Sequence, residues 1–491
     1  MTPGSSGPTP GAHGADTLLQ RIRPGMLGRL ILAHMPALAL LFAVPFGAAV
    51  LEGARELVAP LGLVFGLCAV LAIIALRAGL PADIRRVEVV GALAVLFLLA
   101  ALLAVPGFVR LGLSPVDAFF EAMSGITTTG LSVARGAEDW PIAAHVLRAW
   151  LQWAGGLVMA TAALAMILDP GVPTQRLGEV EIDERDLLTS SRKQARQLLI
   201  AYLAITALGI AGALLLLPTA WEAVVVTLAA VSTGGFAPRG DSLASYGLLA
   251  QAYVIFLCLL GAVSLMTPVL IARRVPLARA FASARRVLGV LGIIAAAYVT
   301  MLVLGGEHDW RAIARHLLNL ASAQTTAGYS VSDMPTQPPL LLLVIVAMAI
   351  GADIGSTGGG LKISRVLLLA QTIRLTLQRP RLPATAVAHL RFRGERMKAD
   401  ELAAVVALMG VYVLAALGIW FTLLAAGYPA MESLFDTVSA LSTVGLGTGV
   451  VGPDLPDRLT VLFTFAMWLG RLEFIAVLVL LMPRSWRRNR N

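Results

Sequence analysis

Four short turns rich in Thr, Ser and Gly have the chemistry to bind a dehydrated monovalent cation. Their hydroxyl and backbone carbonyl oxygens are the ligands that such an ion needs, and none of the turns contains Lys, Arg, Asp or Glu. Glycine adopts positive φ readily, which allows successive carbonyl oxygens to turn towards one axis. The candidate ligands are Thr127, Thr128, Thr129 and Gly130; Val231, Ser232, Thr233 and Gly234; Thr325, Thr326, Ala327 and Gly328; and Ser442, Thr443, Val444 and Gly445.

These turns recur at similar intervals. Their glycines are separated by 104, 94 and 117 residues, and each follows a short helix-like run. The run from Pro115 to Ser124 resembles the run from Pro429 to Ser439. Four matched units of span, short helix, turn and span indicate an internal repeat. Packing of small residues between membrane helices explains any one turn, but four in matched positions favour segments that enter the membrane and return around one axis.

A glycine-rich segment, Gly351–Gly360, interrupts the longest apolar stretch. Gly at five of its ten positions disfavours continuous helix, by about 1 kcal/mol per residue, so we expect two half-helices joined by a loop. Lys362 and Arg471 lie in apolar surroundings where charge is costly, and we expect both to face a pore or a partner. The alternatives are a packing kink and a structural pair of Arg471 with Glu473 or another acid. Three roles stay open for Asp353: a pair with Lys362, a pair with Arg471, or a cation site.

The elements that must position these groups are membrane spans. Of the 491 residues, 58% are hydrophobic and 14% are charged, against about 25% charged in soluble proteins, which argues against a soluble enzyme. Residues 1–20, rich in Gly, Pro and Ser, are expected to form a disordered tail rather than a signal peptide. Ten apolar segments near bilayer-crossing length are predicted at 29–51, 59–79, 88–107, 146–168, 197–217, 249–272, 287–305, 338–376, 402–424 and 458–482.

The basic residues predict how these spans are oriented. Of the 38 Lys and Arg residues, 27 fall in the terminal segments and loops of one side and 8 on the other side. By the positive-inside rule, both termini lie in the cytoplasm. The net charge of +9 is therefore mainly a signal of topology, and no interleaved aromatic and basic patch predicts nucleic-acid binding. We find no nucleophile elbow, phosphate loop, paired catalytic carboxylates or metal-ligand spacing, so we expect no enzyme activity.

Several separate motifs carry a resemblance to a known family. They are Ser124–Gly130, Trp150–Gly156, Ser232–Phe236, Thr326–Tyr329, Gly355–Lys362, Ser442–Gly447 and Met467–Glu473. From about residue 85 to its end, the chain resembles the Trk/Ktr/HKT superfamily of potassium transport proteins, and most of all the TrkH/KtrB membrane subunits. Its two N-terminal spans are similar to the extra pair of TrkH-type subunits. The third turn resembles the KtrB type more closely, so the subtype stays open.

The resemblance implies a fold and its partners. The fold is an all-α polytopic membrane protein with four membrane-helix/pore-helix/membrane-helix repeats around a pseudo-fourfold pore, plus two N-terminal transmembrane helices. The implied units are 21–84 for the extra pair and 85–175, 176–283, 284–385 and 386–491 for the repeats. A homodimer and a cytosolic TrkA/KtrA-like ring are also implied. The regulatory nucleotide (NAD or ATP/ADP) is expected on that ring, and no covalent cofactor on this chain.

The resemblance also implies a gate. Residues 351–360 correspond to an intramembrane gating loop beneath the selectivity filter. The implied gating residues are Gly355, Ser356, Thr357, Gly358, Gly359, Gly360, Lys362 and Arg471. Arg471 matches the family arginine under the filter, where a fixed positive charge repels cations and limits leak.

The function favoured by these observations is K⁺ uptake across the bacterial inner membrane through a selective, gated pore. The alternative is an alternating-access cation symporter, which also uses repeats and broken helices, but four same-sense turns on one side favour the pore. In the family, Ser at the first filter glycine gives Na⁺ tolerance, so Gly130 favours K⁺. The sequence leaves open strict K⁺ selectivity, coupling to H⁺ or Na⁺, and the nucleotide.

Overall fold

The structure is a computed structural model that describes residues 21–79, 84–167, 184–381, 383, 391–392, 395–397 and 399–486. The predicted tail of residues 1–20 lies outside this description, as do the predicted unit boundaries at 175/176 and 385/386. Within the described residues the chain is helical, apart from one antiparallel pair of two-residue strands, β1 (Arg391–Phe392) and β2 (Glu395–Arg396).

All ten predicted spans overlap helices. Seven are single helices: α2 (Met35–Glu52), α3 (Arg55–Ala78), α4 (Arg86–Arg110), α6 (Ile142–Ile167), α7 (Glu184–Ala213), α12 (Ala282–Leu304) and α16 (Ala399–Ala425). Three are divided: α9 (Leu248–Ala262) with α10 (Thr267–Ala272), α14 (Pro338–Ile350) with α15 (Ile363–Gln378), and α18 (Asp457–Arg471) with α19 (Ile475–Leu481). By length and composition, six described helices can cross a membrane, and α18 with α19 makes a seventh despite a bend of 116°. The chain is a polytopic membrane protein.

One of the three breaks agrees with the sequence prediction, and two were not expected. The span predicted at 338–376 stops at Ile350 and resumes at Ile363, as its glycines indicate. Residues 263–266 and 472–474 contain neither Gly nor Pro. The first break is stabilised by a tertiary contact, because the Leu265 amide donates to Gly355 O at 2.9 Å. At the second break, Glu473 and Phe474 adopt φ of 51° and 65°. Positive φ is uncommon for residues other than Gly, so the sequence did not predict this break.

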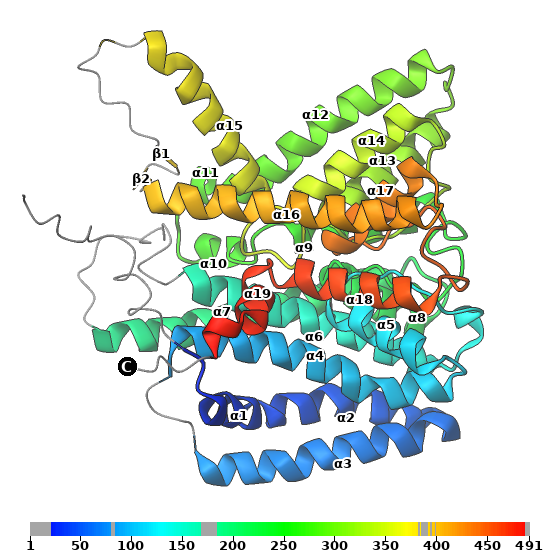
Figure 1. The fold of residues 1–491 in the computed structure, drawn as a ribbon. Helices are drawn as coiled ribbons and strands as arrows, with labels where there is room; N and C mark the ends of the chain where they lie inside the picture. The colour runs from blue at the N-terminus through cyan, green and yellow to red at the C-terminus, as the bar shows by residue number, and fades with distance from the viewer. Residues whose placement is uncertain are drawn as a thin grey trace, which may run out of the picture.

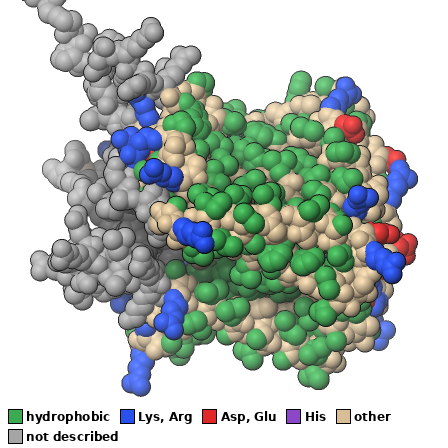
Figure 2. Space-filling model, turned by 90° about the horizontal axis from the view of Figure 1, so that it is seen from below, with side chains coloured by type: hydrophobic (Ala, Val, Ile, Leu, Met, Phe, Trp, Pro, Cys, Tyr) green, Lys and Arg blue, Asp and Glu red, His purple; other side chains and the backbone are tan. Residues whose placement is uncertain are grey.

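The long helices run side by side, with the short α1 (Pro24–Ala33), α2 and α3 at one edge of the bundle (Figure 1). Hydrophobic side chains cover the middle of the face that α3 forms, and Lys and Arg gather at its two ends (Figure 2). Leu63, Leu67, Val70 and Ile74 of α3 recur at helical spacing and are 77%, 54%, 57% and 48% exposed. We interpret this stripe as a surface that contacts lipid tails, because exposing these apolar side chains to water would cost free energy.

Four helices are too short to span and lie between the long ones. They are α5 (Pro115–Ile126), α8 (Ala220–Val231), α13 (Trp310–Thr325) and α17 (Ala430–Leu441), with 12, 12, 16 and 12 residues. Side-chain caps set the first turn of three of them: Ser114 accepts from the Asp117 amide, Thr219 from the Glu222 amide, and Asp309 from the Arg311 amide. The remaining elements are α11 (Leu277–Ala280) and the 3₁₀ turns η1 (Ala137–Asp139), η2 (Arg379–Arg381) and η3 (Pro483–Ser485).

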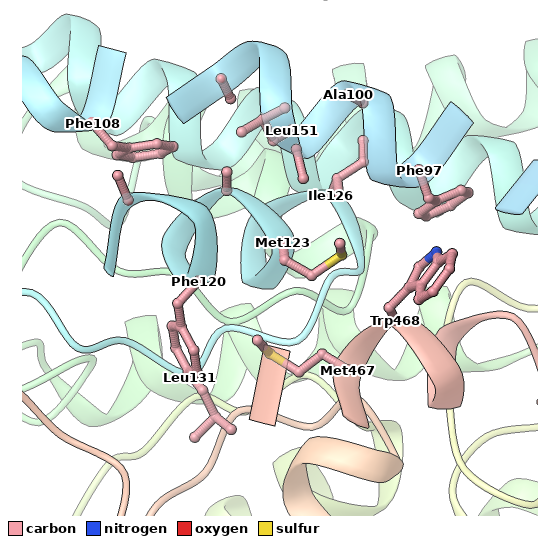
Figure 3. Packing of buried hydrophobic residues seen from close by; sticks show 14 of the residues in the cluster. Phe97, Ala100, Phe108, Phe120, Met123, Ile126, Leu131, Leu151, Met467 and Trp468 are labelled. Atoms are coloured by element: carbon pink, nitrogen blue, oxygen red, sulfur yellow. The ribbon is translucent and has the colours of Figure 1, made fainter. Parts of the chain in front are cut away.

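A hydrophobic core fixes α5 between α4 and α18. Figure 3 shows Phe120, Met123 and Ile126 of α5 between Phe97, Ala100 and Phe108 of α4 and Met467 and Trp468 of α18. All these side chains are buried. The indole Nε1 of Trp468 donates to Ala94 O at 3.1 Å, so a helix near the end of the chain is pinned to the third span.

Glycines in three long helices allow the short helices to approach unusually closely. A Cβ added to Gly155 of α6 would lie 1.9 Å from Ile126 O, and one added to Gly470 of α18 would lie 2.0 Å from Leu441 O. A Cβ added to Gly261 of α9 would lie 2.5 Å from Val231 O. In each pair the long helix touches the last carbonyl of a short helix. The positions of the turns that follow therefore depend on these contacts.

We expect Gly155→Ala and Gly470→Ala each to destabilise the protein, by about 1–3 kcal/mol, because the added methyl overlaps a backbone carbonyl that cannot move alone. Thermal melting in detergent, followed by size-exclusion chromatography, measures the loss. Gly410→Ala in α16 is the matched control, because nothing lies within 4 Å of its added Cβ. A Gly155→Ala protein as stable as the wild type would contradict the close packing.

Candidate ion pathway

The four predicted turns share one backbone conformation. In each, a threonine with positive φ is followed two residues later by a glycine with positive φ. The threonines are Thr128, Thr233, Thr326 and Thr443, with φ of 53°, 55°, 58° and 51°, and the glycines are Gly130, Gly235, Gly328 and Gly445, with φ of 90°, 77°, 77° and 97°. Positive φ is unusual for a β-branched residue, and such strain tends to occur at functional sites. Four repetitions of it indicate one structural role.

The structure shifts the second turn by one residue from the sequence prediction. The sequence aligned Gly234 with Gly130, but Gly235 has the matching conformation. Ser232 then corresponds to Thr127, and Val231 is the last residue of α8. The adjacent glycines made the sequence ambiguous. The threonine two positions before the glycine was the signal that could have resolved the register.

The four turns form a closed ring of backbone contacts. A Cβ added to Gly130 would lie 2.3 Å from Gly234 O, one on Gly235 2.0 Å from Ala327 O, one on Gly328 1.9 Å from Val444 O, and one on Gly445 2.1 Å from Thr129 O. Each glycine therefore packs against the carbonyl of the residue just before the next repeat's glycine. The order runs from the first repeat to the fourth and back to the first. We call this arrangement the glycine ring.

Hydroxyl groups lie next to the glycine ring. The four positive-φ threonines are buried. Thr326 Oγ1 accepts from the Gly359 amide at 2.7 Å, and Thr233 Oγ1 donates to Ser232 O at 2.6 Å. Among the described residues, Thr128 Oγ1 and Thr443 Oγ1 have no hydrogen-bond partner. Buried hydroxyl oxygens without a partner are costly, and a bound cation would satisfy them.

The loop between α14 and α15, residues 351–362, lies against three of the four turns. We call it the glycine loop. Thr357 Oγ1 accepts from Thr233 Oγ1 of the second turn at 3.3 Å, and is also within hydrogen-bonding distance of Val231 O and Gly261 O, at 3.1 and 3.0 Å. The amides of Gly359 and Gly360 donate to Thr326 Oγ1 at 2.7 Å and Ser442 O at 3.1 Å. In this conformation the loop covers one end of the glycine ring.

Two buried cations hold the glycine loop in place. Arg471 Nη1 donates to Thr357 O at 2.9 Å, and its Nη2 donates to Gly155 O at 3.3 Å. Lys362 Nζ donates to Gly358 O. A small cavity beside the loop is lined by Met159, Ser356, Gly358, Gly359, Gly360, Lys362, Gly470, Arg471 and Glu473. The predicted gating residues are therefore brought together, next to the ring.

The structure decides two ion-pair questions that the sequence left open. Glu473 pairs with Arg365, at 2.5 Å, and is not the salt-bridge partner of Arg471. Asp353 pairs with Arg286 of α12 at 2.6 Å and also accepts from Ser283 and Ser364, so neither Lys362 nor Arg471 is its partner. The carboxylate is fully occupied, which leaves it unsuited to hold a free cation. Sequence could not find this pair, because 67 residues separate its members.

A side chain outside the predicted site supports the second turn. Gln152 of α6 accepts from the Phe236 amide at 3.2 Å and donates to Gly234 O. Its amide group occupies the space where a Cβ on Gly234 would lie. The other repeats carry Thr129, Ala327 and Val444 at that position. Among the described residues, no three His, Cys, Asp or Glu side chains gather in a way that could hold a metal ion.

Comparison with known proteins supplies the family. The family model for TrkH, described as a cation transport protein, matches residues 107–488. The chain belongs to the TrkH family of cation transport proteins. A Trk system potassium uptake protein TrkH from Halomonas elongata is 30% identical over 400 residues, which cover 77% of this chain and 80% of the relative. An uncharacterized cation transporter of Methanocaldococcus jannaschii is 26% identical over 407 residues, covering 82% of this chain and 84% of the relative.

A solved structure supports the fold of this TrkH-family chain. The crystal structure of the potassium transporter TrkH from Vibrio parahaemolyticus superimposes with a TM-score of 0.81 and 21% sequence identity. The match covers 94% of this chain and 99% of that one. The polytopic helical architecture predicted from the sequence is confirmed.

We expect Gly235→Ala to reduce ion transport more than Gly234→Ala. A methyl at Gly235 meets the backbone of Ala327 and requires a positive φ, whereas at Gly234 it meets mainly the side chain of Gln152. Strain at positive φ costs about 1–3 kcal/mol. Rb⁺ uptake into proteoliposomes, normalised to folded protein, measures both variants. Equal losses, or a larger loss for Gly234→Ala, would restore the register predicted from the sequence.

Proposed function

We propose that this chain is the K⁺-conducting subunit of a Trk-type uptake system in the bacterial inner membrane. The observation that carries the proposal is the glycine ring, in which each of four turns of one chain packs its glycine against a backbone carbonyl of the next turn. The names of the Halomonas and Vibrio relatives, a potassium uptake protein and a potassium transporter, support the choice of ion. Catalysis is not part of the proposal.

The proposed ligands are the oxygens of the four turns. The carbonyls of Thr129, Gly234, Ala327 and Val444 lie at the ring contacts, and the threonine hydroxyls lie beside them. Carbonyl oxygens replace the hydration shell of K⁺ in selective pores. Each short helix ends at its turn, so the partial negative charge of its C-terminus favours a cation there. The membrane potential drives entry with about 2.3 kcal/mol per charge per 100 mV.

In the proposed mechanism the glycine loop is the gate. Its amides and Thr357 hydrogen-bond to oxygens of three turns, so conduction requires these contacts to break. Arg471 holds the loop through Thr357 O and places a positive charge near the pathway. Opening then requires the guanidinium to release the loop and the loop to withdraw. Because the loop is rich in glycine, this movement meets few side-chain barriers.

The proposal includes partners and orientation. Both termini lie in the cytoplasm. The side of the bundle that carries most of the Lys and Arg residues faces it, as the positive-inside rule requires. Two copies form a homodimer, and a cytosolic TrkA/KtrA-like ring carries the nucleotide site and acts on the glycine loop. The word "system" in the names of the relatives supports a multi-subunit assembly.

We expect the purified chain in proteoliposomes to take up Rb⁺ when a K⁺ diffusion potential is the driving force and no Na⁺ or H⁺ gradient is present. A ring of backbone oxygens needs no co-transported ion, which is the physical reason for this expectation. Isotope uptake measures it, with Gly235→Ala as the inactive control. Uptake that stops unless a second ion gradient is supplied would favour the alternating-access symporter instead.

We expect Arg471→Ala, and separately deletion of residues 355–360, to raise flux. The first removes the hydrogen bond to Thr357 O at 2.9 Å and a positive charge, and the second removes the covering loop. Arg458→Ala is the matched control, because this exposed arginine lies at the opposite end of the same helix. Flux in folded Arg471→Ala protein no higher than in Arg458→Ala would remove Arg471 from the gate.

A further inference from the structure

Three short helices hold the chain that leaves the glycine ring. We call the three residues after each ring glycine the return strand. Glu121 Oε1 accepts from the Val133 amide at 2.9 Å. Asn319 Oδ1 accepts from the Val331 amide at 2.8 Å, and Asp436 Oδ1 accepts from the Thr448 amide at 2.8 Å. Each bond joins a short helix to the return strand of its own repeat.

These bonds occupy one register. In all three repeats the side chain lies nine residues before the ring glycine, and the amide lies three residues after it. The side chains of Glu121, Asn319 and Asp436 are 0%, 2% and 0% exposed, so water does not compete for them. Sequence alignment of the turns does not reveal the register, because Glu, Asn and Asp share only an acceptor oxygen.

The second repeat lacks both halves of the bond. The position nine residues before Gly235 is Val226, whose side chain has no polar atom, and the position three residues after it is Pro238, which has no amide hydrogen. Gln152, from a long helix of the first repeat, holds this return strand instead, through Phe236 N and Gly234 O. With Gln152 counted, a buried polar side chain fixes each return strand, and the second also receives a hydrogen bond at Phe236 O from Tyr329 Oη at 3.3 Å.

Further contacts stiffen these clamps. Asp436 also accepts from the Val451 amide and Thr448 Oγ1, at 2.8 and 2.9 Å. Glu121 pairs with the buried Arg148 at 3.4 Å, and that guanidinium lies 3.9 Å over the Phe236 ring. The first clamp is thereby linked to the return strand of the second repeat.

We propose that Glu121, Asn319, Asp436 and Gln152 are positioning residues that set how far apart the ring carbonyls stand, and thereby the preference for K⁺ over Na⁺. None of them needs to touch the ion. Selectivity in carbonyl filters depends on cavity size or on the field of the coordinating dipoles, and a ring that relaxes changes both. The inference rests on the proposed conduction through the glycine ring.

The test compares truncations at one register position in two repeats. Asn319→Ala removes the acceptor for the Val331 amide, whereas Val226→Ala makes a cavity without removing a hydrogen bond. The readout is the permeability ratio of Rb⁺ to Na⁺ in proteoliposomes, from isotope uptake and reversal potential. We expect the ratio to fall about tenfold for Asn319→Ala, which corresponds to about 1.4 kcal/mol. Val226→Ala keeps the wild-type ratio.

A conservative variant separates the clamp from general packing. Asn319→Gln retains an amide oxygen for the Val331 amide and an amide nitrogen for Ser332, which the Asn319 side chain also bonds at 2.9 Å, and is expected to keep the ratio closer to the wild type than Asn319→Ala does. If Asn319→Ala does not fold, Asn319→Leu replaces it. That variant keeps a side chain of similar size but offers no acceptor to the Val331 amide, and the expected fall in the ratio is again about tenfold.

The outcomes distinguish this inference from the proposed function. A wild-type protein that conducts no Rb⁺ would overturn conduction through the ring, and the clamps with it. A conducting wild type whose Asn319→Ala or Asn319→Leu variant keeps the full ratio would overturn the clamps alone. An equal fall in Val226→Ala would also overturn them, because general loosening would then explain the change.

Discussion

The contact between each ring glycine and a carbonyl oxygen of the next repeat is the constraint on which the rest of the structure depends. These four contacts leave no room for a side chain, so the backbone of every turn is fixed by its neighbours. To meet this condition, the last residues of the short helices must lie at matching positions around the ring. Gly155, Gly261 and Gly470 achieve it, since they let the long helices touch the last carbonyl of a short helix. Hydrophobic packing around Phe120, Met123 and Trp468 then maintains these positions.

Several charged side chains of the interior lie around the glycine loop, and each of them has a backbone or ionic partner. Arg471 and Lys362 donate to carbonyls, while Arg365 and Arg286 pair with Glu473 and Asp353. Buried charge without such partners would be strongly destabilising. The loop is therefore held by many individually breakable bonds. Such bonds suit the movement that we propose for this loop.

The spans, the short helices and the interrupted eighth span were predictable, because each depends on the hydropathy and glycine content of its own segment. The four turns were also predictable, since Thr and Gly at recurrent positions report a special backbone. The second turn was placed one residue early, because Gly234 and Gly235 are indistinguishable in sequence. The breaks at 263–266 and 472–474 and the Arg286–Asp353 pair could not be predicted. They arise from contacts between distant segments, and no local residue pattern encodes them.

Because the ring is built from one chain, its four quarters can change independently. In a pore made of four identical subunits, any replacement alters every quarter at once. Here the second repeat has Val226 and Pro238 where the others have an acceptor and an amide, and Gln152 of the first repeat makes up the difference. The architecture therefore has a finer unit of variation, in which the surroundings of the glycine ring can differ from one side to the next.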